Sequence, residues 1–240
     1  MFEVVSYGDR AYLVNFQQEI DPTVHRQVLA LQLALEQHIQ QHITFLIPAY
    51  TSLTVGFSTK MAGQHIKDFL QTFVLDSAPL ISSTSVTHWK IPVCYDASFA
   101  MDQEEVVRAT GLDWHEVIHA HTEHSYRVYM LGFRPGFGYL GTLPDQICIP
   151  RKQVPRQHVP IGSVGLAGSQ TGIYPVEAPG GWQIIGRCPL SPLQPEKRAP
   201  SLLSVGDRVR FEAVDLETFI FWQRTYVEGK WKRAMWHDES

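Results

Sequence analysis

Apolar positions in the first third of the chain repeat first with the period of a strand and then with that of a helix. Residues 2–16 alternate apolar and polar side chains on both sides of the turn Gly8-Asp9, which predicts a β-hairpin. From Asp21, whose carboxylate suits an N-cap, apolar side chains recur at helical spacing to about His42. Both patterns then repeat, with strands predicted over 43–48 and 52–57 and a helix marked by Ile66, Phe69, Leu70 and Phe73. This order of strands and helices predicts a small α/β unit.

Residues 76–85 separate this unit from a second half of different character. The segment is rich in serine and holds one proline and one charge, so it is the best candidate for a domain boundary. Beyond a strand over 86–93, two short helices are predicted after Asp102 and Asp113, each with a glutamate three residues on, as in a capping box. Short strands between turns follow, over 126–131, 164–167, 182–186 and 209–212, with a last helix over 216–226 favoured by Asp215 as its N-cap. Such a pattern indicates a β-sandwich or barrel.

Glycine and proline are concentrated between Gly132 and Arg187, far above their average usage. Glycine at this density indicates a backbone with positive φ or a close approach of another group, and proline excludes a helix. One interpretation is a set of tight turns in a barrel. The other is that these turns build a binding site, and we favour it because binding residues are often held on loops by a rigid scaffold.

Composition narrows the possible functions. The 240 residues are 44% hydrophobic and 18% charged, as in soluble globular proteins. A net charge of -4 argues against nucleic acid or an anionic membrane as a partner. We find no signal peptide and no apolar run of the roughly 18 residues that a membrane span requires. The three widely spaced cysteines fit a reducing cytosol, so we expect a cytoplasmic protein.

The familiar motifs of nucleotide and nucleophile sites are missing from the sequence. Gly136–Gly141 matches the pattern G-x-G-x-x-G, but Pro144-Asp145 prevents the helix that a dinucleotide fold requires directly after it. The chain has no Walker A motif and no G-x-S-x-G nucleophile elbow. ATP binding in the manner of a P-loop protein is therefore excluded.

Several histidines cluster on and after the second short helix. His115 and His119 lie four residues apart and share a face, but no third ligand is evident, so we predict surface histidines and no metal site. His121 lies at the helix end, before the strand that leads to Gly132, and is a candidate for proton transfer near pH 7. The alternative is a histidine that interacts with the helix dipole.

Three arginines of the Gly/Pro-rich stretch, Arg151, Arg156 and Arg187, lie beside proline or glycine in predicted turns. A guanidinium group suits carboxylate or phosphate, and three of them in one region favour an anionic ligand over isolated surface ion pairs. Further hydrogen bonds and an aromatic wall would come from Gln170, Thr171, Tyr174 and Trp182. Tyr174 and Trp182 fit a hydrophobic core equally well.

Four motifs of this stretch are long and specific: Gly132-Phe-x-Pro-Gly-Phe-x-Tyr-Leu-Gly141, Val159-Pro-x-Gly-Ser163, Gly168-x-Gln-Thr-Gly-Ile-Tyr-Pro175 and Pro179-Gly-Gly-Trp-Gln-Ile-Ile-Gly-Arg187. With Gly8-Asp9-Arg10-Ala11 and Gly206-Asp-Arg-Val they span nearly the whole chain. They resemble the allophanate hydrolase subunit 1 family, which includes the B subunit of bacterial 5-oxoprolinase and the sporulation kinase inhibitor Kip I. Arg134, His115 and His119 depart from the family pattern. The resemblance implies an α+β protein, with a small N-terminal α/β domain over 1–80 and a cyclophilin-like β-barrel domain over 86–228.

The resemblance also implies a part in an ATP-dependent enzyme. In that family, 5-oxoprolinase opens the lactam of 5-oxo-L-proline to L-glutamate, and its B subunit acts with subunits C and A. We therefore expect ATP as a co-substrate of the complex, no bound cofactor and no activity of the isolated chain. Phosphorylation of the amide oxygen followed by attack of water requires cations and one proton-transfer group. We predict His121 and Arg156 as catalytic and, as substrate-binding residues, Arg187, Gln170, Thr171 and Tyr174.

Two other functions stay open at this point. The chain could be a binding module that inhibits a sensor histidine kinase, as Kip I does, which needs no catalytic residue. It could also be a subunit of a hydrolase of the urea or allophanate pathway. Neighbouring genes would separate these possibilities, because a biotin-dependent carboxylase indicates urea and subunits C and A indicate 5-oxoproline.

Overall fold

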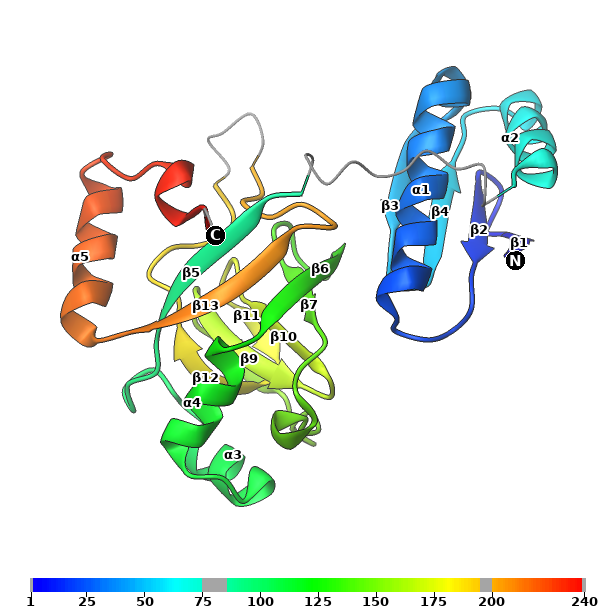
Figure 1. The fold of residues 1–240 in the computed structure, drawn as a ribbon. Coiled ribbons are helices and arrows are strands. Elements are labelled where there is room, and N and C mark those ends of the chain that lie inside the picture. The colour runs from blue at the N-terminus through cyan, green and yellow to red at the C-terminus, as the bar shows by residue number, and fades with distance from the viewer. Residues whose placement is uncertain (1, 75–85, 195–199, 239–240) are drawn as a thin grey trace. The chain divides into compact units, whose positions relative to one another are not determined.

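The computed structural model describes residues 2–74, 86–194 and 200–238. The chain divides into two compact units, Met1–Ser85 and Val86–Ser240, and each has its own hydrophobic core (Figure 1). The segment that the sequence marks as a boundary, 76–85, lies outside the described residues. Within the described ranges, no helix combines the length and apolar character needed to cross a bilayer.

The N-terminal unit is an antiparallel sheet with two helices on one face. Its described strands pair in the order β1 (Glu3–Ser6), β2 (Ala11–Asn15), β4 (Ser52–Gly56) and β3 (Phe45–Pro48). The helices are α1 (Pro22–Ile39), which continues into the 3-10 turn η1 (Gln40–His42), and α2 (Lys60–Thr72). The Asp21 carboxylate accepts hydrogen bonds from the N–H groups of Thr23 and Val24, as an N-cap should. The predicted hairpin and the predicted order of elements are confirmed.

The C-terminal unit is a β-barrel. In the described part of the chain, seven strands close in the order β10-β7-β6-β13-β5-β12-β9. Only β5 and β13 run parallel within that barrel, and β8 pairs with β11 in a separate ribbon. The strand bounds are β5 (His88–Cys94), β6 (Ser125–Leu131), β7 (Gly138–Gly141), β8 (Arg156–Val159), β9 (Ser163–Ala167), β10 (Gln170–Ile173), β11 (Ala178–Gly180), β12 (Gln183–Arg187) and β13 (Arg208–Val214). The predicted fold class, a small α/β unit followed by a β-barrel, is confirmed.

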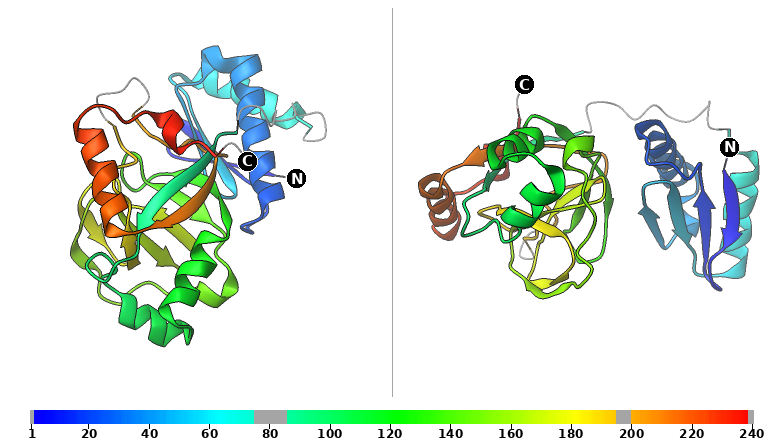
Figure 2. Two further views of the ribbon diagram at one scale, coloured as in Figure 1. Left: turned by 60° about the vertical axis from the view of Figure 1, so that its left-hand side comes forward. Right: turned by 90° about the horizontal axis from the view of Figure 1, so that it is seen from below.

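Helices lie at one end and on the outside of the barrel (Figures 1 and 2). The short helices α3 (Gln103–Thr110) and α4 (Trp114–Thr122) contact each other and lie at the same end. Helix α5 (Leu216–Val227) packs beside β5, and the chain then passes through η5 (Arg233–Trp236) to a β-bridge between His237 and Trp89. The 3-10 turn η4 (Asp145–Ile147) follows β7.

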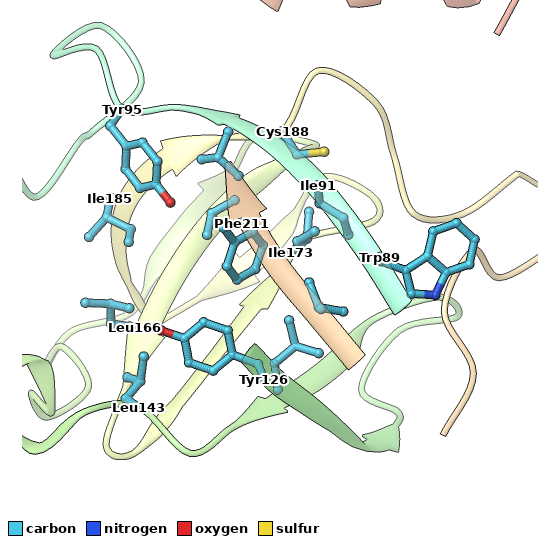
Figure 3. Close-up of a cluster of buried hydrophobic side chains, with 14 of the residues drawn as sticks. Trp89, Ile91, Tyr95, Tyr126, Leu143, Leu166, Ile173, Ile185, Cys188 and Phe211 are labelled. Carbon is cyan, nitrogen blue, oxygen red and sulfur yellow. The ribbon is translucent and has the colours of Figure 1, made fainter. Parts of the chain in front are cut away.

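The barrel interior is packed with large side chains. Tyr95, Tyr126 and Phe211 point inward from different parts of the barrel and meet Ile91 and Leu166 (Figure 3). These five side chains are at most 5% exposed. A barrel of this size is filled by its side chains and leaves no channel.

Glycines in the Gly/Pro-rich stretch allow strands to approach closely. A Cβ at Gly180 would lie 2.1 Å from the Tyr174 hydroxyl, and one at Gly162, where φ is 81°, would lie 2.5 Å from the Cys188 carbonyl oxygen. A side chain at either position would therefore force its neighbour to move. The interpretation of this stretch as tight turns and packed strands of a barrel explains both glycines.

The helix caps of the C-terminal unit were predicted with one error. Asp113 and Glu116 form a complete capping box at α4, and Gly111 ends α3 with a φ of 73°. Asp102 does precede α3, but its side chain makes no capping hydrogen bond. The prediction of a capping box at Asp102 is wrong because its carboxylate is directed at other partners.

Candidate functional site

The predicted site residues do not come together in one place. His121 and Thr171 meet inside the barrel, while Tyr174 lies in a separate aromatic cluster. Arg156 belongs to an ion-pair cluster beside α3, and Arg187 lines a surface pocket. Gln170 is the first residue of β10 and is partly exposed. Each location permits a different kind of chemistry.

His121 is a fully buried histidine in the barrel interior. Its Nδ1 lies 2.7 Å from the Tyr95 hydroxyl and its Nε2 lies 2.9 Å from Thr171 Oγ1. Burial lowers the pKa of His121 to about 3, so the imidazole is neutral at pH 7. Because the side chain has no exposed surface, a substrate would reach it only by displacing one of its two partners. Its role in proton transfer stays a prediction.

Tyr174 lies in a compact aromatic cluster. Its ring meets that of Phe137 edge-on at 5.4 Å, and Phe137 meets Trp182 in the same way at 5.3 Å. Tyr174 and Trp182 are only 2% and 5% exposed, and burial raises the pKa of Tyr174 to about 12. Both residues fit the alternative interpretation as core. Arg151 is exposed and covers one side of this cluster, with its guanidinium carbon 5.9 Å from the Trp182 ring centre.

Asp102 is the centre of a cluster of opposite charges. Its carboxylate, 2% exposed, accepts hydrogen bonds from the Ile184 N–H at 2.6 Å, from Lys152 Nζ at 2.9 Å and from Arg156 Nη2. Glu105, one helical turn along α3, accepts a second hydrogen bond from Lys152. Burial acts to raise the pKa of Asp102, but the hydrogen bonds from Arg156, Ile184 and Lys152 outweigh it, and the pKa lies below its usual value.

The charges of this cluster cancel. Two carboxylates face two cations, and Arg156 uses its Nη2 on Asp102, while its buried Nη1 has no hydrogen-bond partner among the described residues. Sequence reasoning missed Asp102 and Lys152 as members of any site. The sequence offered one signal, the acids Asp102 and Glu105 three residues apart and the basic residues Lys152 and Arg156 four residues apart. This signal does not predict that the acidic pair and the basic pair are in contact.

Arg187 has a different environment at the end of β12. It lines a cavity of about 600 Å³ between α5 and three loops of the barrel, whose lining residues are Ile161, Gly162, Pro175, Val176, Arg187, Cys188, Pro189, Leu190, Ser191, Leu193, Gln223, Tyr226 and Val227. None of these described residues is acidic. Within the described ranges, no carboxylate lies within 4 Å of the Arg187 guanidinium. This pocket, with one cation and mainly apolar walls, is the candidate functional site.

A second pocket involves the two histidines of α4. His115 and His119 line a cavity of about 430 Å³ together with Gln146, Leu112 and the capping-box residues Asp113 and Glu116, whose side chains bond to the helix N-terminus. Across the residues that the structure describes, no group of three or more His, Cys, Asp or Glu side chains is placed to hold a metal ion. The histidine pair alone gives too few ligands for a structural or catalytic zinc.

Comparison with known proteins finds a family model and named relatives that match between half and most of the chain. The family model "Carboxyltransferase domain, subdomain C and D" matches residues 2–203. A Bacillus subtilis protein named as the B subunit of 5-oxoprolinase is 39% identical over 220 residues, which cover 88% of this chain and 92% of that protein. An Escherichia coli O157:H7 protein of the same name is 48% identical over 122 residues, about half of each chain.

Solved structures show the same fold as part of longer chains. The crystal structure of TTHA0988 is 32% identical, with a TM-score of 0.73, and the match covers 86% of this chain but only 40% of that one. The described fold therefore corresponds to less than half of the TTHA0988 chain.

Proposed function

The chain belongs to the family of the carboxyltransferase domain, subdomain C and D, and from this membership we propose that it is the B subunit of an ATP-dependent 5-oxoprolinase. The observation that carries the proposal is the likeness to the B. subtilis relative over 92% of that protein's length. The reaction is the opening of 5-oxo-L-proline to L-glutamate, coupled to hydrolysis of ATP. We place it in the cytoplasm.

We propose that the chain works in a complex with subunits C and A and that the isolated chain is inactive. The relatives are named as one lettered subunit of an enzyme, which supports a multi-subunit assembly. The charge balance of the barrel supports a shared nucleotide site. Lys152 and Arg156 are already paired with carboxylates, and the candidate pocket offers the single cation Arg187, whereas transfer of a phosphoryl group requires several positive charges around the phosphates.

Within this proposal the predicted residues take different parts. Arg156 retains 21% exposure of its side chain, and its Nη1, which has no hydrogen-bond partner in the described part of the chain, is left for a reactant while Nη2 stays on Asp102. Arg187 is the better candidate for an anionic group of the substrate, because no protein carboxylate competes for it in the described part of the chain. We propose that His121 transfers a proton and Thr171 binds the substrate only if a reactant enters the barrel interior, where the two side chains lie within hydrogen-bond distance of each other.

The experiment is a reconstitution. ATP-dependent release of glutamate from 5-oxo-L-proline is measured for this chain alone, for each pair of subunits and for the mixture of this chain with its candidate subunits C and A. We expect activity only in the full mixture. As a control for the other subunits, the B. subtilis relative replaces this chain in an assembly of the B. subtilis subunits C and A. An active control assembly together with an inactive test mixture of folded chains would contradict the proposal.

A further inference from the structure

We propose that the Arg187 pocket is a receptor for a small monocarboxylate with a compact, uncharged body, and that the carboxylate binds the Arg187 guanidinium. Naming the ligand as 5-oxo-L-proline rests on the proposed function. The chemical class of the ligand rests on the pocket alone. Three features of the pocket carry it: the uncompensated cation, the way that cation is held, and the character of the walls.

The first feature is a partly buried cation that has no counter-ion among the residues that the structure describes. Among the described residues, Arg187 is the only charged member of the pocket lining, and no hydrogen bond or ion pair joins its side chain to another of them. Burial lowers the pKa of Arg187, which shows that its charge has lost part of its hydration. Loss of hydration without an ion pair is unfavourable, and a bound carboxylate would supply the missing partner. The contrast with Arg156, which is paired with Asp102, makes the absence of a partner informative.

The second feature is the fixed position of the guanidinium. Its central carbon lies 5.2 Å from the centre of the Phe99 ring, a distance at which cation and ring attract each other. The backbone beside it is also held, because the Cys188 N–H donates to the Gly162 carbonyl at 2.8 Å. A donor that is already oriented loses little conformational entropy when a ligand binds. The arrangement therefore favours recognition of a planar carboxylate by the guanidinium.

The third feature is that no acidic side chain is present among the described residues that line the pocket. The walls are mainly apolar and come from Val176, Leu190, Tyr226 and Val227 among others. The Ser191 hydroxyl is already used, since it donates to the Pro175 carbonyl and accepts from the Leu193 N–H. A ligand with an ammonium group would place that charge on an apolar wall beside an arginine. The pocket should accordingly prefer a neutral ring over an amino acid.

This preference separates the substrate of the proposed reaction from its product. 5-Oxo-L-proline carries one carboxylate and an uncharged lactam, so its net charge matches the pocket. Opening of the lactam by water breaks the C–N bond and gives L-glutamate, which has an ammonium group and a second carboxylate. The described lining of the pocket offers no acid to the ammonium group. Opening of the ring should thus weaken binding and favour release of the product.

The test is equilibrium binding to the folded chain, measured by isothermal titration and by ligand-observed NMR. The probes are 5-oxo-L-proline, cyclopentanecarboxylate, L-proline and L-glutamate. We expect the first two to bind and the two amino acids to bind at least about tenfold more weakly, because of their ammonium group. Arg187→Gln should weaken binding of both carboxylates about tenfold or more, and Arg187→Lys should restore part of the loss. The matched control is Arg224→Gln on the exposed side of α5, which should bind like the wild type.

The outcomes distinguish the pocket from the proposed function. Binding of cyclopentanecarboxylate but not of 5-oxo-L-proline, lost in Arg187→Gln, would support the receptor and count against the substrate. Equal affinity of wild type and a folded Arg187→Gln variant, or no binding of any carboxylate at about 10 mM, would overturn the receptor. In that case an active reconstituted enzyme would leave the proposed function intact and move the substrate site elsewhere.

Discussion

Acidification should destabilise the barrel through one buried histidine. His121 has zero exposure and is enclosed by Tyr95 and Thr171, so protonation would place a charge in the barrel core. Its pKa is about 3 in the folded chain and near 6.5 in the unfolded chain. Between these values the unfolded state binds more protons. The stabilising contribution of the neutral imidazole is therefore complete above about pH 6.5 and is lost progressively as the pH falls toward 3.

The size of this effect follows from the linkage relation. Between about pH 7.5 and about pH 5.0, a group with an unfolded pKa near 6.5 and a much lower folded pKa costs about 2 kcal/mol of unfolding free energy. The result is almost the same for any folded pKa of about 4 or below, because the folded imidazole is then neutral throughout this range. The prediction therefore depends on burial of His121 and not on the depth of the shift.

The assay is urea unfolding followed by tryptophan fluorescence. All six tryptophans lie within 86–240, so the signal reports on the barrel unit alone. We compare the wild type with His121→Gln, in which the amide keeps a donor and an acceptor but does not titrate. The wild type should lose about 2 kcal/mol more than the variant between the two pH values. At each pH, the unfolding free energy of each protein is obtained by linear extrapolation to zero urea. The change between the two pH values is then compared for the wild type and the variant.

The matched control is His119→Gln. His119 is exposed on the same helix, and its substitution should leave the pH dependence of the wild type unchanged. If His121→Gln showed the same pH dependence as the wild type, the histidine would be titrating in the native state, and the inference of a closed barrel core around it would be refuted.

Three further predictions concern packing and burial elsewhere in the barrel unit. Asp102→Asn should lower the unfolding free energy of the barrel by about 3 kcal/mol in the same assay. This value is at the low end for a broken buried ion pair because both cations are partly exposed. Glu105→Gln, at an exposed carboxylate, should cost less than about 1 kcal/mol. Gly180→Ala should cost about 1 to 3 kcal/mol in urea unfolding, as its Cβ would lie 2.1 Å from a buried tyrosine hydroxyl. Ellman's reagent at about pH 8 should react in the folded chain with Cys148 alone, because Cys94 and Cys188 are buried and burial raises the pKa of Cys188 to about 12. All three cysteines should react when the chain is unfolded in urea.

The sequence was most informative where structure depends on neighbours along the chain. The period of apolar residues and the capping residues Asp21, Asp113 and Asp215 placed the helices, and Gly111 placed the end of α3. These signals work because a cap or an amphipathic face involves residues within a few positions. The long glycine motifs indicated the family. At Gly180 the glycine also has a packing role, because a Cβ atom there would lie 2.1 Å from the Tyr174 hydroxyl.

The sequence was least informative where a residue depends on a distant partner. His121 meets Thr171 across 50 positions, and nothing local to either indicates that the barrel will enclose them. Asp102 has the local pattern of an N-cap, yet its carboxylate bonds to Lys152 and Arg156, 50 and 54 positions away. A buried cluster that satisfies three donors outweighs one capping hydrogen bond, which contributes only about 1 kcal/mol.

The two arginines singled out from the sequence show how charge compensation decides between structure and binding. Arg156 and Arg187 have similar local contexts, each beside a proline, a glycine or a cysteine in the same stretch. Arg156 meets the buried Asp102, so its charge is used to stabilise the fold. Arg187 meets an aromatic ring and an apolar cavity, and its charge is left for a ligand. Removing each charge should separate the two roles: Arg156→Gln should lower the stability of the barrel, whereas Arg187→Gln should leave stability nearly unchanged and weaken carboxylate binding about tenfold or more.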